Sequence, residues 1–102
     1  MGLSVNNPAL LEVSGDLTLG TVAGLYEQSR KILPGDIETV DLAGVSRIDS
    51  AGLALLLEWQ AAAHRNSRPL AFRDAPEDLL RLAALSEATR LLGLSARAEQ
   101  AA

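Results

Sequence analysis

The sequence contains no cysteine, only three aromatic residues among 102, and no apolar run longer than Leu53–Leu57. Without cysteine the chain has no disulfide scaffold, no thiolate metal site and no cysteine nucleophile, and this composition suits a reducing cytosol. The apolar run is far shorter than the roughly 20 residues that a membrane span needs. The sequence does not show the charged segment and following apolar stretch that are typical of a signal peptide, so we expect none. We therefore expect a cytoplasmic protein that does not itself insert into a membrane.

Positive charge is also scarce. The chain has 9 basic and 13 acidic residues, a formal net charge of −4 and a sequence pI near 4.8. Binding to nucleic acid requires a basic stripe that meets the phosphates. Nucleic acid is therefore not an expected partner.

Candidate catalytic groups are few. The single histidine, His64, falls inside a predicted helix, with no sequence motif for an oxyanion hole. Gly15, Gly20 and Gly24 precede no Lys-Ser or Lys-Thr pair, which argues against a phosphate-binding loop. A receiver-type phosphorylation domain needs an adjacent acidic pair and a later loop lysine, whereas the only lysine here is Lys31. We expect no catalytic residue, no bound metal and no cofactor.

Leucine (20 residues) and alanine (17 residues) are abundant and supply the apolar residues of one small core. A chain of 102 residues has the length of one domain. We therefore expect a single domain over residues 1–102, with a frayed tail of small residues at 95–102.

Apolar periodicity and turn residues predict strands and helices in alternation. The N-terminal half predicts strands at 3–6 and 9–13 joined by a bend at Asn7-Pro8, a turn at 14–16, a helix capped by Thr18 that ends at Pro34-Gly35, and a central strand at 37–42. The C-terminal half predicts a loop at 43–48, a helix at 51–66, a strand at 70–73, and a helix that starts at Pro76 with Glu77 and Asp78 in its first turn. This order predicts an α/β fold with helices laid against a sheet.

A small polar group stands where the central strand leads into the second predicted helix. Ser50 is placed to act as the helix N-cap, Asp49 adds negative charge at the positive end of the helix dipole, and Gly52 keeps the first turn thin. Plain capping, worth about 1 kcal/mol, is one interpretation of this group. The other is that the thin first turn lets a second surface approach the backbone.

The stretch Val45–Leu57, VSRIDSAGLALLL, resembles the signature of STAS domains, in which a strand, a loop, an Asp-Ser/Thr pair, a Gly and a Leu-rich helix follow one another. Ser14–Thr18 resembles the Gly-x-Leu-Asp opening of the family's first helix, with Thr18 in place of the aspartate. The helix after Ala75-Pro76 and the stretch Leu91–Leu94 are similar to its C-terminal part. The resemblance implies a STAS-like (SpoIIAA-like) fold, a mixed sheet of roughly four strands with helices packed against it.

Within the family, the run Gly52–Leu57 most resembles the MlaB branch, small cytosolic subunits of Mla phospholipid-transporting ABC complexes. That resemblance implies a non-catalytic subunit that binds and stabilises or regulates the ATPase subunit. The complex also contains permease and lipid-binding subunits and maintains outer-membrane lipid asymmetry, so the chain would lie at the inner membrane.

The alternative implied by the resemblance is an anti-sigma-factor antagonist that is switched by phosphorylation. In that branch the residue at the position of Ser50 is phosphorylated by the partner kinase, and the added charge breaks the complex. The antagonists often have a second hydroxyl residue where this chain has Ala51, which favours the MlaB-like interpretation.

The helix after the signature is apolar on two sides. Leu53 and Leu56 belong to a stripe that we assign to the core, and Leu55 and Trp59 to a second stripe. Contact with a neighbouring helix would explain the second stripe, and so would docking on a partner protein, where Trp is a common hot spot. On the docking hypothesis, Trp59→Ala weakens binding and leaves the melting temperature nearly unchanged. The partner-binding surface then consists of Asp49, Ser50, Ala51, Gly52, Leu55 and Trp59.

Overall fold

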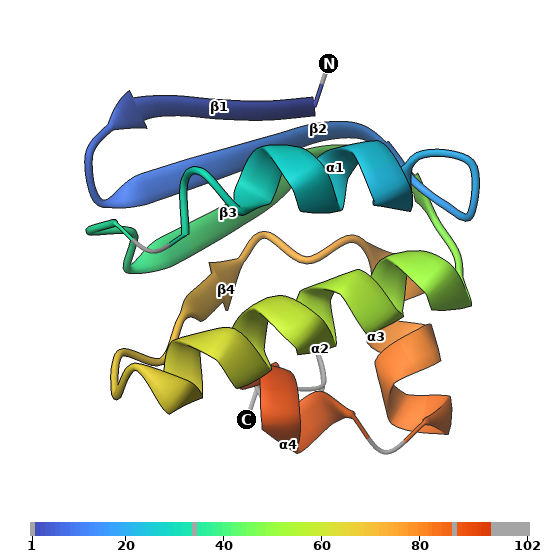
Figure 1. The fold of residues 1–102 in the computed structure, drawn as a ribbon. Helices are drawn as coiled ribbons and strands as arrows, with labels where there is room; N and C mark the ends of the chain where they lie inside the picture. Colours follow the sequence, from blue (N-terminus) through green and yellow to red (C-terminus); the bar gives the residue numbers. More distant parts are fainter. Residues whose placement is uncertain (1, 34, 87, 95–102) are drawn as a thin grey trace.

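The computed structural model describes residues 2–33, 35–86 and 88–94, which fold around a four-stranded sheet in the order β1-β2-β3-β4 (Figure 1). β1 (Gly2–Asn7) pairs antiparallel with β2 (Leu10–Leu17). β2, β3 (Thr39–Ile48) and β4 (Ala71–Arg73) run parallel to one another. The sheet is therefore mixed, and the strand predicted as central occupies an interior position.

The helices form a layer beside the sheet. α1 (Val22–Ser29) and α2 (Ser50–Arg65) lie against it, and α3 (Glu77–Leu85) and α4 (Thr89–Leu92) pack on the side of α2 that is turned away from α1 (Figure 1). α2 therefore has neighbours on three sides: the sheet, α1, and the pair α3 and α4. Each of the two apolar stripes of α2 therefore has a surface within the domain against which it can pack.

Strand residues alternate between a buried and an open side of the sheet, as the pleat requires. In β2, Leu11 and Val13 are buried, whereas Glu12 between them is only half-buried. Pairs of polar side chains lie on the open side. One of them joins neighbouring strands, with 3.2 Å between the Arg73 guanidinium and the Asp41 carboxylate. The hydrophobic core therefore lies on the helix side.

The segment that leads into β4 is held by a side chain of α2. The amide of Gln60 donates from Nε2 to the carbonyl of Leu70 at 2.9 Å, and its Oε1 accepts from the Leu70 N–H at 2.8 Å. Gln60 is buried, and this pair of bonds satisfies both ends of its amide. Gln60 thus supplies the two bonds that a neighbouring strand would otherwise make.

Several predicted elements are confirmed. The first two strands form a hairpin, although its turn falls at residues 8–9. α2 and β4 begin within one residue of the predicted starts, and α3 follows Pro76 with Glu77 and Asp78 in its first turn. The predicted tail at 95–102 lies outside the described residues. Within the described ranges, no helix has the length and apolar character needed to cross a bilayer.

Two strands are longer than predicted. Ser14–Asp16 is not a turn but part of β2, and the segment 43–48, predicted as a loop, continues β3. The register between β2 and β3 shifts twice, and each time β3 has one residue more than β2. Such bulges bend a strand without ending it. Gly15, whose φ of 86° favours glycine, stands at one of these shifts, which explains its turn-like sequence.

α1 is shorter than predicted at both ends. Thr18 is not the N-cap, because the helix begins at Val22 with Thr21 as its N-cap. Thr18 lies in the preceding turn, where its carbonyl accepts from the N–H groups of Thr21 (2.9 Å) and Val22 (3.0 Å). The helix ends at Ser29, whose hydroxyl donates to the Tyr26 carbonyl at 2.7 Å. Local bonds of this kind compete with the helical pattern.

Candidate functional site

The N-cap of α2 is Asp49 and not Ser50, which corrects the sequence-based assignment. Asp49 has extended backbone angles (φ −126°, ψ −171°), and its Oδ1 accepts from the N–H groups of Ala51 at 2.9 Å and Gly52 at 3.1 Å. These are two of the N–H groups that every helix leaves without an internal partner. The capping that sequence analysis expected is present, one residue earlier.

The second oxygen of Asp49 binds another part of the chain. Oδ2 accepts from the backbone N–H of Leu19 at 3.1 Å, and the N–H of Asp49 donates to the Leu17 carbonyl at 3.1 Å. The hydrogen bond from Leu19, followed by those from Gly52 and Ala51, holds the pKa of Asp49 below its ordinary value of 3.8. The carboxylate therefore stays ionised at neutral pH and connects the loop between β2 and α1 to the start of α2.

Ser50 is the first residue of α2 and is exposed to solvent. Among the hydrogen bonds of the described residues, none involves its hydroxyl, so the oxygen is available to a second molecule. Ala51 beside it is half-buried. Of the predicted partner-binding residues, Ser50 is thus the one whose side chain is both polar and accessible.

Gly52 is buried and faces the chain's own β2. A Cβ atom at this position would lie 2.1 Å from the Leu17 carbonyl oxygen, 2.8 Å from the Leu17 Cβ and 2.9 Å from Ile48 Cγ1. The expectation that Gly52 keeps the helix thin is therefore correct. The surface that approaches it, however, is the end of the sheet, so Gly52 is not open to a second protein.

Leu55 and Trp59 do not form an exposed docking face, and the expectation that they do is wrong. Leu55 is 6% and Trp59 2% exposed, and the Trp59 indole N–H donates to the Ser29 hydroxyl at 2.9 Å across the contact with α1. The neighbouring-helix explanation is the right one for Trp59, because α1 covers this side of α2. Both residues belong to the hydrophobic core.

Sequence reasoning missed Leu19. It is 78% exposed, and its backbone contact with Asp49 places it beside the start of α2. Arg47, two residues before Asp49, is also exposed and lies 3.9 Å from the Asp16 carboxylate. The sequence-based prediction places Leu19 inside a helix capped by Thr18. Leu19 instead lies in the loop before α1, where its side chain is exposed. The accessible site therefore consists of Ser50 with Leu19 beside it, supported by Asp49 and Gly52.

The described residues hold no cluster of three histidine or acidic side chains that could bind a metal ion. What the site offers is a hydroxyl, an exposed leucine and a helix start whose first N–H groups already have a carboxylate partner. Among the described residues, no base forms a hydrogen bond with the Ser50 oxygen, and its hydroxyl is accessible to a second molecule.

The architecture defines the class of fold. A mixed four-stranded sheet with helices in this arrangement is the STAS fold, and the chain is similar to the solved structure of the anti-sigma factor antagonist SpoIIAA in its unphosphorylated form. The TM-score is 0.60 at 14% sequence identity, over 78% of this chain and 77% of that chain. A likeness at this identity concerns the fold alone.

Membership of the family follows from the sequence. A family model described as "Mlab, STAS domain" matches residues 4–94, and the chain belongs to this family of STAS domains. No curated protein matches the chain.

Proposed function

We propose that this protein is a non-catalytic STAS subunit that binds and stabilises or regulates the ATPase subunit of an Mla-type phospholipid-transport ABC complex. The observation that supports this role is the match of residues 4–94 to the MlaB-type family model. In this proposal the chain lies in the cytoplasm at the inner membrane, held there by a complex with permease and lipid-binding subunits. The complex would maintain the lipid asymmetry of the outer membrane.

The contact surface in this proposal is the start of α2. Ser50 would offer its hydroxyl, and Leu19 would place an exposed apolar side chain against the ATPase subunit. An exposed leucine beside a polar group suits an interface, in which a few apolar anchors supply most of the binding energy. Asp49 and Gly52 would act indirectly, by fixing the loop and the helix start that present these two side chains.

Co-expression with the candidate ATPase subunit, followed by affinity capture and titration of the purified pair, tests the proposal. We expect stable capture, and we expect Leu19→Ser and Ser50→Asp each to weaken binding at least tenfold without unfolding the domain. Leu85→Ser is the matched control, because Leu85 on α3 is 83% exposed and lies on a different helix. The proposal is contradicted if the unmodified chain does not capture the ATPase subunit. It is also contradicted if Leu85→Ser is the only one of the three variants that weakens binding.

A second candidate function is a phospho-switched anti-sigma-factor antagonist. The exposed, unbonded hydroxyl of Ser50 favours it, because a kinase could reach this oxygen. A phosphate there would add about −1.5 to −2 charges beside Asp49. The Asp49 carboxylate already occupies the N–H groups of Ala51 and Gly52, so the new charge would find few free backbone donors and would repel a partner.

Phosphorylation distinguishes the two functions. Incubation with ATP and a kinase encoded next to this chain, analysed by intact mass, gives one added phosphate on the antagonist hypothesis and none in Ser50→Ala. Permease, ATPase and lipid-binding transport genes beside the chain would support the transport subunit, whereas a kinase and a sigma factor would support the antagonist.

A further inference from the structure

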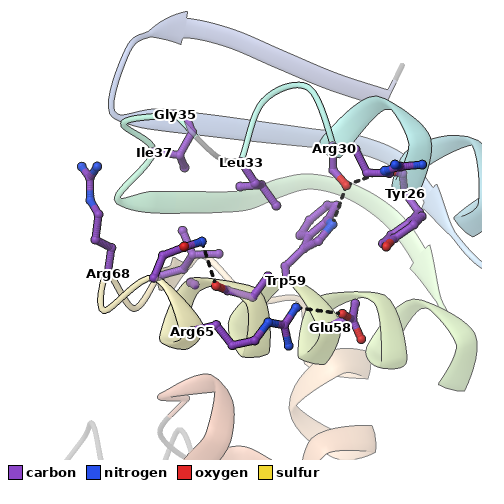
Figure 2. A pocket seen from close by; sticks show the side chains of 14 residues that line it. Tyr26, Arg30, Leu33, Gly35, Ile37, Glu58, Trp59, Arg65 and Arg68 are labelled. Atoms are coloured by element: carbon purple, nitrogen blue, oxygen red, sulfur yellow. Dashed lines mark hydrogen bonds and ion pairs between the residues drawn. The ribbon is translucent and has the colours of Figure 1, made fainter.

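A cavity lies between α1 and α2 at the end of the domain opposite Ser50. Its volume is about 270 Å³, and its walls come from the last turn of α1, the C-terminal half of α2 and the segments before β3 and β4 (Figure 2). Trp59 stands on α2 nine residues after Ser50, which is a rise of roughly 13 Å along the helix. The cavity is therefore separate from the proposed contact surface, and a ligand could bind in it whether or not the proposed function is correct.

The floor of the cavity is apolar. Trp59, Leu33, Ile37 and Leu70 line it, and three of these four side chains are otherwise buried in the core. The indole N–H of Trp59 already donates to Ser29, so the ring offers a ligand only its apolar surface. A floor of this kind favours a hydrocarbon or aromatic group, because such a group displaces water from apolar surface.

The rim of the cavity carries three arginines. Arg30 just after α1, Arg65 from α2 and Arg68 from the loop after α2 line it, and the one acidic residue in the lining is Glu58 (Figure 2). The cavity thus gathers three of the chain's nine basic residues in a protein whose net charge is −4. Each of the three guanidinium groups lies 3.3 to 3.6 Å from an exposed carboxylate, of Glu27, Glu58 or Asp36. Exposed pairs of this kind contribute little, so a ligand carboxylate can replace one of them.

We propose that this cavity binds a small amphipathic anion, a short hydrocarbon or aromatic group that ends in one carboxylate. The hydrocarbon would lie on the Trp59 floor and the carboxylate would pair with the Arg65 or Arg68 guanidinium, whose planar fork matches two carboxylate oxygens. The volume is slightly below the roughly 300–1,000 Å³ of most small-molecule sites, which limits the ligand to about the size of octanoate.

The only tryptophan of the chain reports on this site. Titration of the full-length protein with octanoate, followed by Trp59 fluorescence and by the NMR signal of its indole N–H, measures occupancy directly. We expect a saturable change with octanoate and at least tenfold weaker binding of octanol, which has the same chain length and no charge. We expect the double variant Arg65→Gln/Arg68→Gln to bind octanoate at least tenfold more weakly at an unchanged melting temperature.

Arg81→Gln is the matched control, because Arg81 is also an exposed arginine in an ion pair, with Asp78, but lies on α3 away from the cavity. Its octanoate affinity should equal that of the unmodified chain. The proposal is overturned if the indole signal does not shift up to millimolar octanoate, or if the double variant binds as tightly as Arg81→Gln. Equal affinity for octanol and octanoate also overturns it and would assign the cavity to an uncharged apolar group, such as a side chain of a partner protein.

Discussion

The two ends of α2 differ in what surrounds them. At the N-terminal end, Ser50 is exposed and Asp49 binds the loop between β2 and α1. In the C-terminal half, Trp59 and Gln60 are buried and bind α1 and the segment before β4 through their polar atoms. The large apolar side chain, which looked like an interface residue in the sequence, is a core residue, and the small hydroxyl is the accessible one.

The burial of Trp59 follows from the number of elements that α2 contacts. A helix that packs only on a sheet needs one apolar stripe, whereas α2 also contacts α1, α3 and α4. Its second stripe is therefore used inside the domain. If this comparison is right, substitutions of the buried Trp59 and Gln60 lower stability, and substitutions at Ser50 affect only contacts with other molecules.

The largest effect is expected for Trp59→Ala. Removal of a buried Trp side chain should lower the free energy of unfolding by about 3–5 kcal/mol, measured by urea denaturation. Leu85→Ala, at an exposed position, should change it by no more than about 0.5 kcal/mol. Trp59→Phe keeps the fold testable if the alanine variant does not fold. If Trp59→Ala left the stability unchanged, this result would contradict the burial of Trp59 and support the hypothesis of an exposed docking face.

Gly52→Ala should lower stability by about 1–3 kcal/mol, because the new methyl group would overlap the Leu17 carbonyl. The control is Gly24→Ala in α1, where no atom lies within 4 Å of the added Cβ. There the same substitution should raise stability by about 0.5–1 kcal/mol, because alanine is the better helix former. Opposite signs in the two variants are the expected result, and equal signs would contradict the close approach.

Asp49→Asn should lower stability at neutral pH and have less effect in acid. The hydrogen bond from Leu19, with those from Gly52 and Ala51, lowers the pKa of Asp49 in the folded state below 3.8. Its contribution is therefore complete above that value and is lost as the pH falls through the folded pKa. Urea denaturation at pH 7 and pH 3 measures this difference. Ser50→Ala, which removes no titratable group, should show the same difference from the parent at both pH values.

The smallest effect on stability is expected for Ser50→Ala. The hydroxyl makes no hydrogen bond among those of the described residues, so the free energy of unfolding should change by less than about 0.5 kcal/mol. Thermal denaturation of the two chains side by side measures it. A loss comparable to that of Asp49→Asn would mean that Ser50 supports the helix start and is not simply exposed on it.

Much of the fold could be predicted from local patterns. The helix after Ser50, the interior strand and the first-turn acids of α3 depend on periodicity and capping, which are properties of neighbouring residues. The family resemblance in Val45–Leu57 supplied the expected fold class, and the fold comparison confirms it.

The errors came from contacts between distant residues. Asp49 and Ser50 are both good N-cap residues, so the local sequence does not decide between them. Asp49 also accepts a hydrogen bond from the N–H of Leu19, which is thirty positions away in the chain. A second apolar stripe indicates a helix partner and a protein partner equally well, and only the position of α1 decides between them. Leu19 could be found only after the true start of α1 was known.

The pair of bonds between Gln60 and Leu70 also bears on the order in which the domain assembles. β4 has three residues, too few to hold its register by itself, and the Leu70 amide at its entrance has its partner on α2. The amide hydrogen of Leu70 should therefore exchange with solvent at the rate at which α2 detaches from the sheet. We therefore expect β4 to become ordered only after α2 has docked on the sheet.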